Sequence, residues 1–199
     1  MPNTYVMTDI HGRLAPLKSL LEQIPAGSKI VFLGDYVDRG SESREVVELV
    51  RSLPNTVCLR GNHEDMLLAP DPGCWLANGG ASTVLSYRHP LTGDLDGDAL
   101  IQDMEWFRSL PTIHSDARRV YVHAGVDERL DLDAMPESLT QWHRYTSMAD
   151  IGYRGKTVVH GHTPGIFIGH NRICLDAGQK KMCCGVFYDD SNAVELLWA

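Results

Sequence analysis

The stretch GDYVDRG, residues 34–40, follows the apolar run IVFL at residues 30–33 and precedes a segment with helical apolar spacing. Two aspartates, one arginine and two glycines therefore lie where a strand is expected to pass into a helix. In open α/β sheets, ligands bind at the carboxyl ends of the strands. We therefore expect this stretch to supply charged groups to a ligand site.

Strand and helix patterns alternate on both sides of this stretch. The apolar spacing predicts strands at residues 4–8, 29–33 and 56–60 and helices at residues 14–24 and 41–53, with Ser41 or Ser43 as the N-cap of the second helix. A β-α-β-α-β order favours parallel strands joined by right-handed crossovers.

The rest of the chain changes character twice. Residues 65–112 are expected to be mostly helical, with connections that contain glycine and proline. Five further strands are predicted at residues 119–125, 156–162, 172–176, 184–190 and 193–199. No helix pattern separates the final ones, so we expect them to pair antiparallel.

Composition limits the class of protein. A chain of 199 residues with 43% apolar and 22% charged content fits one globular domain, residues 1–199. The formal charge of −8 argues against a nucleic-acid partner. We see neither a signal peptide nor a membrane-spanning run, and the five cysteines are odd in number. These features favour a cytoplasmic protein with reduced thiols and no membrane partner; a monomer is favoured.

Polar clusters follow five predicted strands, and each contains or adjoins a glycine. They contain Asp9 and His11; Asp35, Asp38 and Arg39; Asn62 and His63; His123; and His160 and His162. One such cluster alone is equally well explained as a helix cap or a surface turn. Together they offer carboxylate, amide and imidazole donors, which suit a borderline divalent metal. The donors are too many for one ion and about right for two, with the central Asp35 as the bridging ligand.

These clusters also carry a family resemblance. The motifs TDIHG (8–12), GDYVDRG (34–40), LRGNHE (59–64), VHAG (122–125) and GHTP (161–164) resemble those of the calcineurin-like metallophosphoesterases. More narrowly, they resemble the bacterial and phage PPP-type serine/threonine protein phosphatases. The resemblance implies an α/β sandwich of two mixed β-sheets flanked by α-helices, with the metals at one edge.

The resemblance also implies a role for each residue. Asp9 and His11 would bind the first metal, Asp35 would bridge both ions, and Asn62, His123 and His162 would bind the second, with Asn62 also facing the substrate. His63 would be the general acid, oriented by Asp38, and Arg39 would hold the phosphate oxygens. Arg144, in a weaker Trp-x-Arg match, would be a second phosphate ligand. His160 is not a ligand in the family and is expected to pack behind the site.

The implied function is a phosphomonoesterase that uses two divalent ions. Mn²⁺ is the expected metal, and Fe and Zn also fit these donors. A metal-bridging hydroxide would attack phosphoserine or phosphothreonine directly, with phosphotyrosine a further substrate, so the partner is a phosphorylated protein or a small phosphoester. The alternative is a symmetrical dinucleoside tetraphosphatase or another nucleotide phosphohydrolase. The GHTP motif leans towards the phosphatase. A degenerate metal-binding scaffold ranks last, because every expected site residue is present.

The segment 74–87 is expected to lie near this site. Asn78, Gly79, Gly80 and Tyr87 either shape the substrate pocket or form a helix–helix turn with a core aromatic. The sequence favours neither interpretation.

Overall fold

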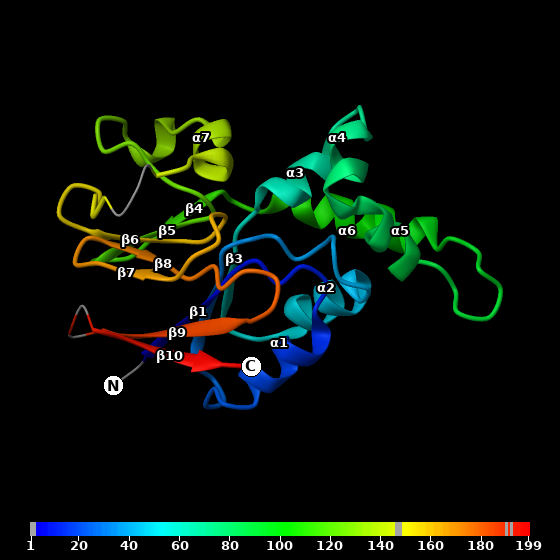
Figure 1. Ribbon diagram of the computed structural model, residues 1–199, viewed down its shortest axis with the longest axis horizontal. Coiled ribbons are helices and arrows are strands. Elements are labelled where there is room, and N and C mark those ends of the chain that lie inside the picture. Colours follow the sequence, from blue (N-terminus) through cyan, green and yellow to red (C-terminus); the bar gives the residue numbers. More distant parts are fainter. Residues whose placement is uncertain (1–2, 146–148, 190, 192) are drawn as a thin grey trace.

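Two five-stranded β-sheets pack against each other, and helices cover the outer face of the first (Figure 1). The computed structural model describes residues 3–145, 149–189, 191 and 193–199. Both sheets mix parallel and antiparallel pairs, so the predicted sandwich of two mixed sheets is confirmed.

The first sheet contains the predicted β-α-β-α-β unit. Its strand order is β10-β9-β1-β2-β3. The strands are β1 (Asn3–Met7), β2 (Lys29–Phe32), β3 (Thr56–Cys58), β9 (Cys183–Tyr188) and β10 (Val194–Trp198). Strands β1, β2 and β3 pair in parallel, and β9 pairs antiparallel with both β1 and β10, as expected.

The second sheet has the order β4-β5-β6-β8-β7. Its strands are β4 (Ile113–Ser115), β5 (Arg119–Val122), β6 (Thr157–His160), β7 (Phe167–Ile168) and β8 (Arg172–Cys174). Strand β8 runs antiparallel to β7 but parallel to β6, so the expected antiparallel pairing holds at only one of its edges. The short strand β7, which the sequence analysis missed, carries the chain back along the edge before β8 begins.

The helices fall into three groups. Helices α1 (Leu14–Leu21) and α2 (Ser43–Ser52) connect the parallel strands of the first sheet. The predicted helical segment contains α3 (Asn62–Leu68), α4 (Gly73–Trp75), the π-turn η1 (Leu76–Gly80), α5 (Ala81–Ser86) and α6 (Gly97–Ser109). The 3₁₀ turn η2 (Leu132–Ala134) and α7 (Glu137–Trp142) lie beside the second sheet.

The alternation of side chains along the strands divides the core. Tyr5 and Met7 of β1 pack towards the helices, whereas Val6 faces the second sheet and joins Tyr121 and Val159 in the layer between the sheets. Both faces of β1 are therefore buried, which explains why Tyr5, Val6 and Met7 form an apolar run rather than alternating with polar residues.

The predicted N-cap of α2 was wrong. The helix begins at Ser43 with Glu42 as its N-cap residue, and no side chain caps it. The Ser43 hydroxyl instead accepts a hydrogen bond of 3.2 Å from the backbone N–H of Asp38. Ser43 therefore supports the GDYVDRG loop rather than its own helix.

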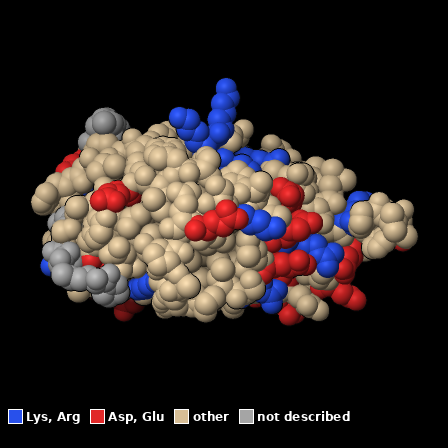
Figure 2. Space-filling view, turned by 90° about the horizontal axis from the view of Figure 1, so that it is seen from below, with Lys and Arg blue, Asp and Glu red and all other residues tan. Residues whose placement is uncertain are grey.

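Acidic and basic side chains are interspersed over one half of the face that Figure 2 shows. This pattern, with the formal charge of −8, differs from the basic face that nucleic acids favour. Across the described part of the chain, no helix combines the length and apolarity that a membrane crossing requires.

Gly61 provides a test of how closely the loops after β2 and β3 pack. A Cβ atom at this residue would lie 2.6 Å from the backbone nitrogen of Asp35 and would collide with the Asp35 carboxylate. We expect Gly61→Ala to lower the free energy of unfolding by about 1–3 kcal/mol, the usual cost of overpacking. Urea denaturation measures this change.

The matched control is Gly97→Ala, because nothing lies within 4 Å of a Cβ atom there. Equal losses of stability in the two variants would contradict the close approach of the two loops.

Candidate metal centre

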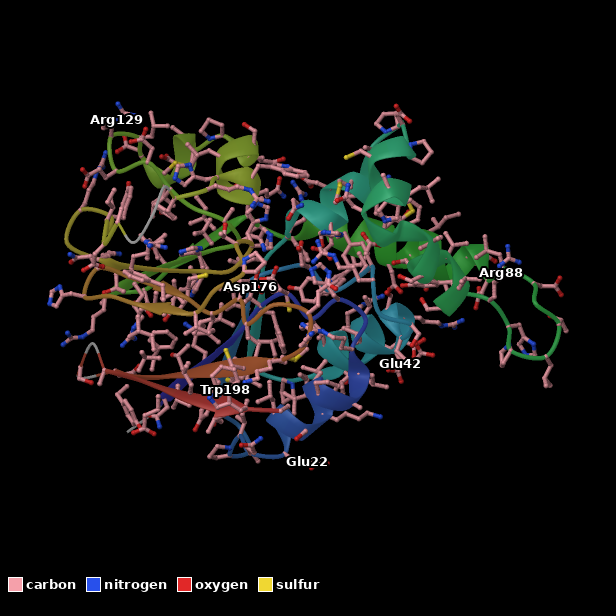
Figure 3. All side chains as sticks on the ribbon, in the orientation of Figure 1. Glu22, Glu42, Arg88, Arg129, Asp176 and Trp198 are labelled. Atoms are coloured by element: carbon pink, nitrogen blue, oxygen red, sulfur yellow. The ribbon has the colours of Figure 1, made fainter. Side chains whose placement is uncertain are left out.

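The strand-end loops of both sheets meet at one edge of the sandwich, near Asp176 at the centre of Figure 3. Asp35 is central to the cluster. Its Oδ2 atom lies 3.5 Å from His11 Nε2 and 3.5 Å from His123 Nε2. Among the described residues, two groups of three side chains lie close enough together to hold a metal ion, and Asp35 belongs to both. Its partners are His11 and His63 in one group and Asp9 and His123 in the other. This His/Asp cluster is consistent with a binuclear metal centre.

A second set of donors adjoins His123. Asn62 Oδ1 lies 2.8 Å from His123 Nε2 and 3.0 Å from His162 Nδ1. Asn62 begins α3, His123 follows β5, and His162 follows β6. Three loops from two sheets thus bring an amide oxygen and two imidazoles together. These are the residues that the sequence assigned to the second ion.

Backbone carbonyls orient two of the imidazoles. His11 Nδ1 donates to Val37 O at 2.9 Å, and His123 Nδ1 donates to Leu33 O at 3.0 Å. Because Nδ1 carries the proton, Nε2 of each ring presents a lone pair to the cluster. Metal-ligating histidines are oriented in the same way.

Burial keeps two imidazoles of the cluster neutral, those of His11 and His162. Desolvation, followed by the nearby His63, holds the pKa of His11 well below its usual value. Burial, followed by the neighbouring His123, lowers the pKa of His162 to about 3. Neutral imidazole is the form that binds metal.

The donors fit two divalent cations. Burial raises the pKa of Asp35 well above its usual value, so nearby positive charge is needed to stabilise its ionised form. Nε2 of the buried His162 has no hydrogen-bond partner among the described residues. Buried polar atoms are normally paired, so such an atom beside carboxylates is explained by a ligand. Oxygen and nitrogen donors without thiolates match the expected type of ion.

His63 and Asp38 form the predicted pair. His63 Nδ1 lies 2.6 Å from Asp38 Oδ2, and Asp38 is fully buried. The other carboxylate oxygen of Asp38 accepts from Trp75 Nε1 at 2.8 Å and from the Thr83 hydroxyl at 2.6 Å. Trp75 and Thr83 thus connect the helical segment to the site, and the sequence analysis did not identify either one.

Two of the three cavity-lining arginines are the predicted phosphate ligands. Arg39 donates to Nε2 of His11 at 2.6 Å and to Nε2 of His63 at 2.9 Å. Arg144 lies in the wall of the same cavity. The cavity measures about 270 Å³, and its walls include Asp9, His11, Arg13, Arg39, Arg144 and His162. The structure therefore brings both arginines beside the cluster.

Glu64 is a further residue whose role sequence reasoning missed. Its fully buried carboxylate accepts the backbone N–H groups of Asp35 at 2.9 Å, Tyr36 at 2.8 Å and Gly61 at 2.9 Å. Burial raises the pKa of Glu64, and these three donors oppose that shift. The E of LRGNHE was the available signal, because a glutamate three residues after an N-cap commonly bonds back to it.

The backbone of the site is unusual. Eight described residues other than glycine have positive φ. Six of them belong to the site: Asp9, His11, Asp35, Asp38, Arg39 and His162. Left-handed backbone at residues other than glycine costs energy and concentrates at functional sites.

The remaining candidates have clear positions. His160 packs behind the site as expected: its Nδ1 lies 2.9 Å from Gly161 O and its Nε2 lies 3.0 Å from an Arg172 nitrogen. Tyr87 is a core residue whose hydroxyl donates to Asp103. The Gly79 carbonyl accepts from the backbone of Arg39 at 3.4 Å, so the glycine turn does contact the site. Asn78 is exposed.

The sandwich and its buried aspartate–histidine cluster are typical of the metallophosphoesterase class. A family model described as calcineurin-like phosphoesterase matches residues 2–193, and the chain belongs to that family. The predicted calcineurin-like family is therefore confirmed, whereas the narrower resemblance to the PPP-type protein phosphatases stays a prediction.

A curated relative from Marinomonas sp. strain MWYL1 is named a symmetrical bis(5'-nucleosyl)-tetraphosphatase. It is 40% identical over 136 residues, which cover 65% of this chain and 46% of the relative. The chain therefore spans about half the length of the curated relatives it matches.

Solved structures show the same fold. A crystal structure described as a candidate diadenosine tetraphosphatase superposes with a TM-score of 0.72 at 22% identity, over 100% of this chain and 96% of that one. A cold-active protein-tyrosine phosphatase of Shewanella sp. has a TM-score of 0.64 at 19% identity, over 99% and 80%.

Thr83 tests the link between the helical segment and Asp38. Thr83→Val removes a donor to the Asp38 carboxylate and the nearer of two acceptors for the Asp38 backbone N–H, at 2.9 Å against 3.2 Å for the Ser43 hydroxyl. A buried polar group left without its partner costs about 1–3 kcal/mol. We expect a loss of that size in urea denaturation.

Thr83→Ser is the matched control, because it keeps the hydroxyl and removes only a methyl group. The role assigned to the hydroxyl is wrong if the serine variant loses as much stability as the valine variant.

Proposed function

We propose that this chain hydrolyses symmetrical dinucleoside tetraphosphates with two divalent cations, Mn²⁺ being the first to test. The choice of substrate rests on the 40% identity with a relative that is named a symmetrical bis(5'-nucleosyl)-tetraphosphatase. The buried cluster around Asp35 supports the phosphoester chemistry. The named relatives favour this reading over the phosphoprotein reading that the motifs suggested.

Each residue has a proposed task. Asp9, His11 and Asp35 would hold one cation, and Asp35, Asn62, His123 and His162 the other. When bound, the two cations supply positive charge for the phosphate oxygens and lower the pKa of nearby water.

His63 is proposed to donate the proton that the leaving oxygen takes up. Because its Nδ1 faces Asp38 at 2.6 Å, Nε2 is the nitrogen that meets the substrate. Buried Asp38 orients the ring for this step.

Arg39 and Arg144 are proposed to bind the phosphate oxygens. Arg39 reaches the Nε2 atoms of His11 and His63, so its guanidinium lies where a phosphate on the cluster would present its oxygens. Guanidinium binds such oxygens through two parallel N–H groups.

A phosphoprotein phosphatase is the second candidate. The GHTP motif, residues 161–164, favours it, because proline follows where the broader superfamily carries a further histidine ligand.

The deciding assay supplies Mn²⁺ to metal-stripped protein with diadenosine tetraphosphate and a phosphoserine/phosphothreonine peptide side by side. We expect the dinucleotide to be split into ADP alone, because symmetrical cleavage breaks the central anhydride bond. Phosphate release from the peptide with an intact dinucleotide would transfer the assignment to the phosphatase. Parallel samples with Fe and Zn identify the ion that supports the fastest turnover.

His63→Asn tests the proton donor. We expect turnover of the preferred substrate to fall about 10²- to 10⁴-fold, the usual contribution of general acid catalysis. Metal content, measured by elemental analysis, should not change, because His63 holds a proton rather than an ion.

The control is His170→Asn, at an exposed histidine in the turn between β7 and β8. If His63→Asn loses metal together with activity, His63 is a ligand and the assigned role is incorrect.

A further inference from the structure

A second cavity adjoins the metal centre through Arg144, which lies in the wall of both. It measures about 340 Å³ and lies between α7 and the loop that follows β5. Arg129, labelled beside α7 in Figure 3, marks its outer rim. We call this cavity the side pocket. Its volume falls within the roughly 300–1,000 Å³ typical of small-molecule sites.

The wall of the side pocket is largely uncharged. Val126, Leu139 and Ile151 contribute aliphatic surface, and His143 and Tyr145 contribute two rings with centroids 4.5 Å apart. Burial lowers the pKa of His143, so this ring is neutral near pH 7. Such a wall suits a flat, uncharged heteroaromatic group.

The charges around the side pocket are arranged in order. Arg144 lies on the side shared with the metal centre, whereas Asp127, Glu128 and Arg129 line the side pocket and not the cavity of the metal centre. Within this group Arg129 Nε donates to Asp127 Oδ1 at 2.8 Å, so the pair is neutral overall. Carboxylates accept hydrogen bonds from sugar hydroxyls and from the amino group of a base, but they repel phosphates. A ligand with phosphates at one end and a neutral, hydroxyl-bearing ring system at the other matches this order.

We propose that the side pocket receives one nucleoside of the dinucleotide, with the base against His143 and Tyr145 and the ribose towards Asp127. This inference rests on the proposed function and adds the part of the chain that recognises the nucleoside. The phosphates extend past Arg144 to the metal centre. A phosphoserine side chain is too short to fill the same space.

A third cavity, of about 280 Å³, meets the metal centre at Pro164 and carries the ring of Phe167. The Arg172 guanidinium already lies 4.2 Å from the centre of that ring. The same guanidinium lies 4.7 Å from the centre of the Tyr145 ring, so aromatic surface alone does not separate the two cavities. Arg144 does, because it joins the side pocket to the metal centre and does not line the third cavity, and this makes the side pocket the better nucleoside site.

Ile151→Trp tests the proposal by filling the side pocket. Ile151 is 48% exposed, so the larger side chain has room to fold. Ile101→Trp on α6 is the matched control, at an isoleucine that is 55% exposed and outside the wall of the pocket. KM and kcat are measured with diadenosine tetraphosphate and with inorganic tetrapolyphosphate, which has no nucleoside.

We expect Ile151→Trp to raise KM for the dinucleotide at least tenfold and to change KM for tetrapolyphosphate less than twofold. Ile101→Trp should match the wild type on both substrates. Equal effects of Ile151→Trp on both substrates, or none on either, would overturn the inference while dinucleotide hydrolysis by the wild type stands.

Calorimetry of ADP and of pyrophosphate separates this inference from the proposed function. If the wild-type protein does not split the dinucleotide, the proposed function is wrong. The binding of ADP still tests whether the side pocket is a nucleoside site. ADP should then bind more tightly than pyrophosphate, and Ile151→Trp should remove that difference. Equal binding of the two ligands by the wild type would reject the side pocket as a nucleoside site.

Discussion

The buried carboxylate of Glu64 holds the site together. It accepts backbone N–H groups from Asp35, Tyr36 and Gly61, so one side chain joins the loop after β2 to the start of α3. Asp35 makes a second link between the same two segments, because its Oδ1 accepts a hydrogen bond of 3.0 Å from the backbone N–H of His63. The central carboxylate of the cluster and the proposed proton donor are therefore fixed by the same pair of loops. A buried charge persists only when such donors surround it.

Much of the fold and the site could be predicted from the sequence, because the signals are local. A strand, a glycine and a polar group in succession mark where a loop leaves a sheet, and parallel strands bring those loops to one edge. Asp9, Asp35 and His123 were found in this way. Trp75 and Thr83 were not, because their bonds to Asp38 depend on how the helical segment packs against the loop after β2. Strand β7, two residues long between glycines, offers too little periodicity to detect.

The identity of the substrate is a separate question from the identity of the reaction. The cluster around Asp35 would face a phosphate in either proposed substrate and would serve an ester or an anhydride equally well. Discrimination must come from surfaces beyond the phosphate, which the motifs do not contain. Val126, Leu139 and Ile151 belong to no motif, and they come together only when β5 and α7 are placed. The motifs therefore led to the calcineurin-like family, and the proposed choice of a dinucleotide over a phosphoprotein rests on the relatives.

The left-handed backbone at six site residues sets a trade-off between catalysis and robustness. Aspartate and histidine tolerate positive φ better than bulky residues do, whereas Arg39, at φ 69°, has no such tolerance. The chain keeps an arginine where glycine would relax the backbone, and it thereby gives up stability for a functional group. Glycine at residue 39 would relax the backbone there, but it would remove the guanidinium that reaches His11 and His63.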